Sequence, residues 1–239
     1  AATPGDTCQD YIPVFIANGF YRNKTDFVDQ HVIYDWRAKY PKIDGYRNTG
    51  RLIRLRDKIL VNMDFKRQTV SHHEDVRVSY DISKYKDIMR SRWNPWEDRP
   101  IETAAELCMA LRRVTNSDES RAVAVLELLE DHPKAIIFYS YDYELDILRS
   151  LGYPEGTEIA EWNGHKHQEI PTGDKWVYLV QYTAGCEGRN CITTDTIIFY
   201  SQQYSSKVAP QAAARLDRLN PPTRDVTYCH MTRFYGIEL

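Results

Sequence analysis

The chain has 239 residues, 42% of them hydrophobic and 27% charged, with a formal net charge of -3. This composition is typical of a soluble globular protein of one or two domains, and the near balance of charge excludes a protein that coats nucleic acid with its whole surface. A local basic groove is still compatible with it. The five cysteines lack a regular close spacing, which indicates reduced thiols and argues against a zinc site. No apolar run has the length of a membrane span, and no signal peptide opens the chain.

The first half of the chain has an irregular pattern. A partly helical stretch is predicted for residues 8–20, and a short helix for residues 31–41, where Pro41 would end it. Strands are predicted at residues 58–65 and 74–80. Helical segments follow at residues 82–93, 100–114 and 120–131. We place the boundary near residue 80, so that residues 1–80 form a helical and extended segment packed on an α/β unit of residues 81–239.

Strands and helices alternate in the second half. Compact β-branched and aromatic runs predict strands at residues 134–140, 157–164, 176–181, 195–201 and 225–231. Helices are predicted at residues 143–152 and around residues 211–218. Such alternation implies parallel strands with right-handed crossovers. The predicted fold class is therefore α/β, a three-layer α/β/α sandwich with a mostly parallel sheet.

The segment QAAARLDRLNPP, from Gln211 to Pro222, is predicted to be the end of a helix, because alanines favour helix and prolines stop it. At about 100° per residue, Gln211, Arg215 and Arg218 fall within about 60° of one another. Two cations and an amide on one narrow face suit an anionic partner. Taken alone, such an arginine pair more often marks a solvated face or an ion-pair donor.

A small and polar loop follows the strand at residues 176–181. In open α/β sheets, ligands bind beyond the carboxyl ends of the strands, and glycines let the backbone approach a ligand closely. Glycines after a strand often mean only a turn, so this feature gains weight only together with the arginine helix. The small and polar residues at this strand end are Gln181, Thr183, Gly185, Gly188, Arg189 and Asn190.

The stretch QYTAGCEGRNCITTDTIIFYS, followed by QAAARLDRLN, resembles motifs V and VI of superfamily 2 helicases. It is most similar to the Swi/Snf-type DNA translocases and to phage-type DEAD/DEAH-box helicases. Those families carry an A-G-x-x-G-x-N loop, a strand near an Asp, and a helix with Q-x-x-G-R-x-x-R. The matching positions are Ala184, Gly185, Gly188, Asn190, Asp195, Gln211, Arg215 and Arg218. KAIIFYSYDYELDILRSL resembles motif IV, EWNGHK the strand and turn after it, and AATPGDT motif III.

The resemblance implies the second RecA-like domain of a motor that binds ATP and Mg²⁺ between two such domains. The chain departs from the pattern at Ala214, where the family has glycine, and contains no G-x-x-x-x-G-K-[ST] loop or D-E-x-[DH] strand. We therefore expect ATP and Mg²⁺ to be held mainly by an N-terminal RecA-like domain of the same or a companion chain. The isolated chain is then expected to be inactive, as a fragment or one half of a split enzyme.

The resemblance also assigns roles to single residues. Arg218 is the first candidate for a catalytic arginine finger and Arg215 the second, since a guanidinium can neutralise charge on a transferred phosphoryl group. The candidates for nucleotide contacts are Gln211, Gly188 and Glu187. The candidates for contacts with a nucleic-acid backbone, expected to be that of double-stranded DNA, are Thr183, Gln181, Ser140 and Asn163.

Other functions are compatible with parts of the pattern. A RecA-like module without enzymatic activity, which binds nucleic acid or a protein, is the main alternative. A self-contained nucleotide kinase or small NTPase is disfavoured because the phosphate loop is missing. The histidines in HHED point to different sides of a strand, so we expect no metal site there. We expect a cytoplasmic protein (in the host cytoplasm if a phage encodes it) without a membrane partner.

Overall fold

The computed structural model describes residues 7–61, 69–185, 193–203, 212 and 224–233. The chain forms two compact units. The described residues of the first, the N-terminal unit, are 7–61, and those of the second, the sheet unit, begin at residue 69. Among the described helices, none is both long enough and apolar enough to cross a bilayer.

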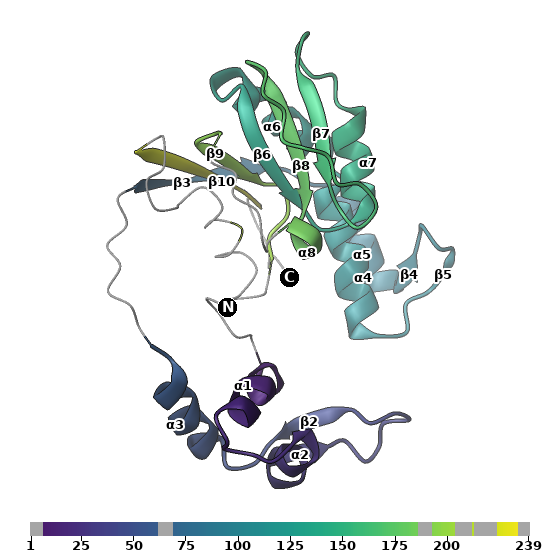
Figure 1. Ribbon diagram of the computed structural model, residues 1–239. Coiled ribbons are helices and arrows are strands. Elements are labelled where there is room, and N and C mark those ends of the chain that lie inside the picture. Colours follow the sequence, from purple (N-terminus) through teal and green to yellow (C-terminus); the bar gives the residue numbers. More distant parts are fainter. Residues whose placement is uncertain (1–6, 62–68, 186–192, 204–211, 213–223, 234–239) are drawn as a thin grey trace. The chain divides into compact units, whose positions relative to one another are not determined.

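The N-terminal unit is a small helical domain with one β-hairpin (Figure 1). Its elements are η1 (Cys8–Tyr11), α1 (Ile12–Ala17), α2 (Lys24–His31), β1 (Val32–Tyr34), β2 (Ile43–Tyr46) and α3 (Thr49–Ile59). Phe15, Tyr21 and Phe27 form a buried aromatic core. His31 is fully buried there, with Nε2 2.8 Å from the Tyr21 hydroxyl and Nδ1 2.9 Å from the carbonyl oxygen of Arg47.

The strand predicted for residues 58–65 is wrong at its start, because Lys58 and Ile59 end α3, and residues 62–65 lie outside the described residues. The helix predicted for residues 31–41 is wrong as well. His31 ends α2, and the chain then extends as β1, which pairs antiparallel with β2. Burial decreases along β1 from Val32, which packs in the aromatic core, to the exposed Tyr34, and the register of the strand pair shifts between Ile33 and Tyr34. Val32 and Ile33 are β-branched and favour a strand. Pro41 therefore lies in the hairpin loop and does not end a helix.

The sheet unit contains all other described elements, and the strands and helices predicted from residue 81 to residue 201 are confirmed. In chain order the first are β3 (Val70–Val78), α4 (Ile82–Ser91), β4 (Trp93–Asn94), β5 (Arg99–Pro100), α5 (Ala104–Asn116) and α6 (Glu119–Asp131). The rest are β6 (Lys134–Tyr139), α7 (Asp142–Ser150), β7 (Glu158–Trp162), β8 (Trp176–Gln181), α8 (Tyr182–Gly185), β9 (Thr196–Phe199) and β10 (Asp225–Arg233). The chain divides after Lys66, and β3, which the sequence pattern groups with residues 1–80, is a strand of the large sheet.

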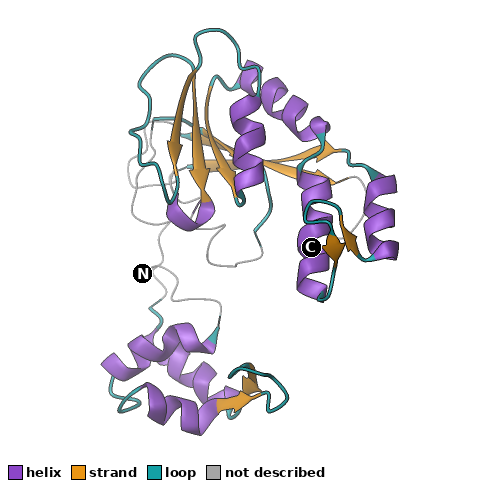
Figure 2. Ribbon diagram, turned by 90° about the vertical axis from the view of Figure 1, so that its right-hand side faces the viewer, coloured by secondary structure: helices purple, strands orange, loops and turns teal. Residues whose placement is uncertain are grey.

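The six-stranded sheet has the order β3-β10-β9-β6-β8-β7, and all neighbouring strands are parallel. On one face α6 and α7 pack against Ile137 and its neighbours (Figure 2). On the other face, Ile136, Phe138 and the buried Ala212 belong to a second apolar cluster. Residues of β6 are buried from both faces, which explains why its sequence is apolar without alternation. The predicted α/β class with a parallel sheet is confirmed.

A buried polar cluster joins the carboxyl end of the central strands to α5 and α7. Its centre is Glu144, whose side chain is fully buried in the first turn of α7. Oε1 accepts from Asn116 Nδ2 at 2.8 Å and from the Tyr143 hydroxyl at 3.2 Å. Oε2 accepts from the backbone N–H of Ser140 at 2.7 Å and from Ser201 Oγ at 2.9 Å. Glu144 thus acts only as an acceptor and ties four segments together, and we call these groups the Glu144 cluster.

Arg121 extends the same region of the core. Its side chain is 2% exposed, donates to the carbonyl oxygens of Thr115 and Tyr200, and lies over the Tyr200 ring. The Tyr200 hydroxyl donates to the carbonyl oxygen of Asn116 at 2.9 Å. These bonds pair the carbonyl groups where α5 and β9 end, which the interior would otherwise leave without donors.

A second ionic contact fixes α7 to the end of β7. Arg149 donates to both oxygens of Glu161, at 2.8 and 2.7 Å, and Lys166 lies 3.4 Å from the same carboxylate. The Arg149 guanidinium holds the pKa of Glu161 below its usual value, although burial opposes this. The pair stabilises the fold only while Glu161 is ionised.

We expect Glu144→Gln to lower the free energy of unfolding by at least about 2 kcal/mol, because one acceptor oxygen becomes an NH₂ group that faces buried donors. Urea unfolding monitored by circular dichroism would measure the change. Glu127→Gln, on the exposed side of α6, is the matched control and should shift the value by less than about 0.5 kcal/mol. Equal stability of the two variants would contradict the role of the Glu144 cluster.

Arg149→Met should lower the free energy of unfolding at pH 7 by about 1–3 kcal/mol, since it leaves a buried carboxylate with Lys166 and the Asn163 amide as its partners. The folded-state pKa of Glu161 is depressed, so its contribution is complete above the unfolded value of about 4.3 and is lost as pH falls through the folded value. The difference from wild type should therefore shrink between pH 7 and pH 3. A constant difference across that range would show that the effect is one of packing.

Candidate functional site

Four residues predicted to contact nucleic acid lie at one edge of the sheet. Ser140 follows β6, Asn163 follows β7, and Gln181 ends β8 just before Thr183. In the register of the sheet, Tyr139 pairs with Gln181 and Trp162 pairs with Val180. The carboxyl ends of three neighbouring strands therefore bring these residues to the same edge, where α/β sheets bind ligands.

Thr183 and Gln181 occupy the middle strand end of this edge. The short helix α8 begins directly after β8, with Tyr182 fully buried and its hydroxyl donating to the carbonyl oxygen of Ser201 at 2.9 Å. Burial raises the pKa of Tyr182 well above its ordinary value. With the Tyr182 side chain anchored inside, Thr183 is exposed and Gln181 half-buried. Trp162 Nε1 donates to the carbonyl oxygen of Ala184 at 3.1 Å and joins this turn to the end of β7.

Ser140 belongs to the Glu144 cluster as well as to the edge. Its Oγ lies 2.9 Å from Ser201 Oγ and accepts from Gln203 Nε2 at 2.6 Å. Because the Ser201 hydroxyl donates to Glu144, the Ser140 hydroxyl must be the donor to Ser201. The Ser140 side chain is thus held in one orientation, with its proton donated to Ser201 and one of its two acceptor sites engaged by the Gln203 amide.

Asn163 shapes a turn with its own side chain. It is 5% exposed, and its Oδ1 accepts from the backbone N–H groups of His165 and Lys166 at 2.9 Å. Its Nδ2 donates to Glu161 at 3.2 Å. These bonds fix a turn whose exposed residues are His165, Lys166 and His167, and the His167 ring packs 4.3 Å from that of Trp162. Any contact of this turn with a ligand would come from those exposed groups.

Five of the predicted site residues lie outside the described residues: Arg218, Arg215, Gln211, Gly188 and Glu187. Their roles stay predictions. Ala212, within the segment predicted as the arginine helix, is helical and fully buried beside Tyr228 and Val226. A small side chain at this position suits close packing against the sheet.

The sequence reasoning missed Glu144, Ser201 and Gln203. A signal for Glu144 exists, because it stands three residues after Tyr141 at the spacing of a capping box, and the backbone N–H of Tyr141 donates to it at 3.4 Å. Ser201 and Gln203 have no comparable local pattern. Only the pairing of β9 with β6 brings them beside Ser140.

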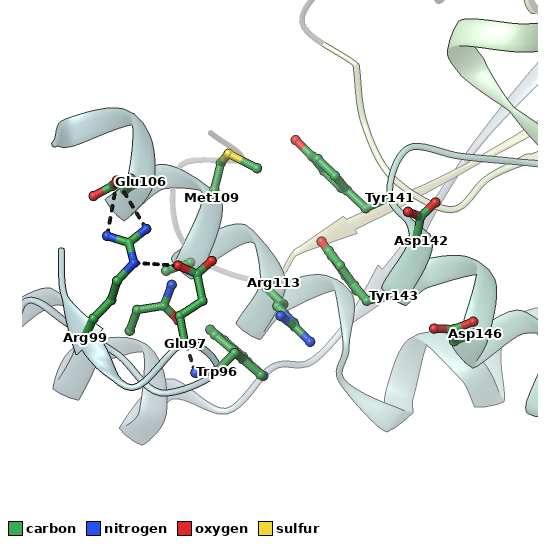
Figure 3. A pocket seen from close by; sticks show the side chains of 12 residues that line it. Trp96, Glu97, Arg99, Glu106, Met109, Arg113, Tyr141, Asp142, Tyr143 and Asp146 are labelled. Atoms are coloured by element: carbon green, nitrogen blue, oxygen red, sulfur yellow. Dashed lines mark hydrogen bonds and ion pairs between the residues drawn. The ribbon is translucent and has the colours of Figure 1, made fainter. Parts of the chain in front are cut away.

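A cavity of about 460 Å³ opens next to this edge, between α5, the β4–β5 hairpin and the start of α7 (Figure 3). The guanidinium of Arg113 lies 4.7 Å from the centroid of the Trp96 ring and 5.2 Å from that of Tyr143. Arg99 is paired with Glu97 and Glu106, so it does not offer a free charge. The charged residues that line the cavity are Glu97, Arg99, Glu106, Arg113, Asp142 and Asp146. Carboxylates outnumber guanidinium groups, which argues against a phosphate site here.

Two solved structures share this fold. The C-terminal part of the Fun30 ATPase domain aligns with a TM-score of 0.56 and 13% identity, over 71% of this chain and 87% of that one. The SWI2/SNF2 ATPase core of Sulfolobus solfataricus, solved in complex with double-stranded DNA, aligns with a TM-score of 0.50 and 14% identity. That alignment covers 68% of this chain and 41% of the ATPase core. No protein-family model and no curated protein matches the chain.

At this level of identity the similarity is one of fold. The six-stranded parallel sheet with helices against it is the RecA-like α/β arrangement of these ATPase domains. The chain spans less than half of the SWI2/SNF2 core. It therefore has the fold found in the C-terminal part of the Fun30 ATPase domain.

Proposed function

We propose that this chain is the second motor domain of an ATP-dependent helicase or translocase that moves along nucleic acid, and along double-stranded DNA in particular. The observation that carries the proposal is the position of Gln181 and Thr183. They lie at the carboxyl end of β8, between those of β6 and β7, and lead directly into the sequence that resembles motif V. The likeness of fold to two Swi/Snf-type ATPase structures supports the proposal.

In this proposal the exposed edge contacts the sugar–phosphate backbone. Thr183 offers a hydroxyl and Gln181 an amide to phosphate oxygens, and the turn held by Asn163 offers Lys166. Ser140, locked by the Glu144 cluster, positions the neighbouring strand end. Contacts of this kind fix position and orientation without reading sequence, as a translocase requires.

The catalytic part of the proposal rests on the resemblance to motif VI. Arg218, with Arg215 beside it, would stabilise charge on the phosphoryl group during hydrolysis, and Gln211, Gly188 and Glu187 would contact the nucleotide. ATP and Mg²⁺ would be held mainly by a separate N-terminal RecA-like domain. The part of this chain that the structure describes contains no group of three or more His, Cys, Asp or Glu placed to hold a metal ion.

The isolated chain should hydrolyse ATP at a rate near background, and addition of the N-terminal RecA-like domain should restore DNA-stimulated hydrolysis. In that reconstituted enzyme, Arg218→Ala should lower kcat by about 10³-fold or more, because an arginine finger acts on the transition state, while nucleotide affinity stays nearly unchanged. Arg224→Ala, an exposed arginine just before β10, is the matched control. An active Arg218→Ala enzyme would refute the finger assignment, and failure to restore any hydrolysis would leave a non-enzymatic binding module.

The double variant Gln181→Ala, Thr183→Ala should weaken binding of the chain to duplex DNA about tenfold or more, since each side chain would lose a hydrogen bond to a charged group. Neither residue is charged, so the slope of affinity against salt concentration should not change. Fluorescence anisotropy at several salt concentrations measures both quantities. Thr193→Ala, exposed before the amino end of β9, is the control. Unchanged affinity of the double variant would remove this edge from the nucleic-acid interface.

A further inference from the structure

The loop between β1 and β2 exposes two aromatic side chains and three cations. Trp36 is 83% exposed and Tyr40 73% exposed, by far the most exposed aromatic side chains among the described residues. Arg37, Lys39 and Lys42 alternate with them and are exposed as well. We call these five residues the aromatic tip. In both views the loop that carries them projects beyond the helices of the N-terminal unit (Figures 1 and 2).

The aromatic tip stands on an ordered base. Val32 is buried in the core of the N-terminal unit, and Ile43 and Tyr46 pack against the same core. The backbone N–H of Asp35 donates to the carbonyl oxygen of Lys42 at 2.8 Å and closes the loop. The Asp35 carboxylate accepts from the backbone N–H of Arg37 at 2.9 Å. The hairpin therefore buries its own apolar residues and still presents Trp36 and Tyr40 to solvent.

Cations lie on the exposed rings. The Arg37 guanidinium is 4.9 Å from the centroid of the Trp36 ring, and the Lys39 ammonium is 5.9 Å from that of Tyr40. A cation on one face leaves the other face open for stacking. Among the described residues, no carboxylate forms an ion pair with the three cations of the aromatic tip.

The charge of the N-terminal unit differs from that of the whole chain. Residues 7–61 contain ten lysines and arginines against six aspartates and no glutamate, whereas the chain as a whole has a formal net charge of -3. An excess of positive charge gathered in one unit of an acidic chain favours a polyanionic partner. The cavity of Figure 3, by contrast, is lined by more acids than bases.

We propose that the aromatic tip binds unpaired bases of a nucleic acid, with Trp36 and Tyr40 stacking on bases while Arg37, Lys39 and Lys42 contact the adjacent phosphates. Aromatic rings interleaved with basic side chains are the general means of holding a single strand without sequence preference. The inference rests on the proposed function, which makes nucleic acid the partner. It adds a second contact: the aromatic tip binds bases, whereas the sheet edge contacts the sugar–phosphate backbone. A protein partner would use the rings but has less need of three cations gathered on one loop.

The test uses the full chain and a fluorescently labelled single-stranded oligothymidylate. Trp36→Ala should weaken binding by about 5- to 100-fold, the range for loss of one stacked base, and Trp36→Phe should restore most of the affinity. Trp93→Ala, another exposed tryptophan in the sheet unit, is the matched control and should have no effect. Lys39→Ala should lower the slope of log affinity against log salt by about 0.7, whereas Trp36→Ala should leave the slope unchanged. Thermal unfolding would verify that each variant is folded.

An oligonucleotide with abasic sites separates stacking from charge. Wild type should bind it at least as weakly as Trp36→Ala binds the intact strand, because the stacking of Tyr40 is lost as well, and Trp36→Ala should cause no further loss on the abasic strand. Equal affinity of wild type and Trp36→Ala for the intact strand would overturn the inference, and so would an equal loss on the abasic strand. If Trp36→Ala instead weakens association with the N-terminal RecA-like domain and leaves oligonucleotide binding intact, the tip is a protein contact.

The outcome is distinguishable from that of the motor proposal. Restored ATP hydrolysis together with an unaffected Trp36→Ala variant would overturn the aromatic tip alone. A tip effect without restored hydrolysis would support the single-strand site and remove the motor assignment. A chain that binds no nucleic acid at all would overturn both.

Discussion

The sheet edge depends on one buried carboxyl group. Glu144 is inaccessible to solvent and accepts hydrogen bonds from the end of α5, from the backbone after β6, from the segment after β9 and from its own helix. A buried polar group is costly unless its bonding capacity is used, so the cluster is stable only when all of these segments are in place at once. The strand end that presents Ser140 is therefore positioned by this centre, and the turn of Thr183 is joined to it through Ser201, whose carbonyl oxygen accepts from the Tyr182 hydroxyl.

The burial of Glu144 also affects the tyrosines around it. Burial, and then the charge of Glu144, raise the pKa of Tyr143, and the same two causes act on Tyr182. Both phenols thus stay protonated and act as donors to the cluster and to the carbonyl oxygen of Ser201. These two phenolic donors behind the edge are therefore uncharged, while Thr183 and Lys166 at the edge are exposed.

The sequence predicts the strands correctly where both faces of a strand are buried, because such strands have a recognisable run of apolar residues. The apolar runs of β6, β8 and β9 have no polar alternation because helices or loops cover both sides, and this predicts buried parallel strands directly. Residues 31–41, which include β1, were mispredicted as helix, because the pairing partner β2 lies beyond an irregular loop and the short strand has too few residues to show a period. Glu144 was missed for a related reason, since a charged residue in an amphipathic helix looks solvent-exposed until the partners from α5 and β9 are known. Asn163 was placed at the correct edge, but its side chain proved to shape a turn.

The order of strands has a consequence for how the molecule assembles. β10 (residues 225–233) lies between β3 (residues 70–78) and β9, so the second strand from one side of the sheet is made of the last described residues. Contacts between segments so distant in sequence form slowly, because the entropy cost of closing a long loop precedes the free energy gained from the contacts. During synthesis, the edge of β3 that pairs with β10 stays unpaired until β10 has left the ribosome. A chain whose synthesis stops before β10 would therefore expose the unpaired edge of β3, and exposed strand edges tend to pair with other chains or to bind chaperones.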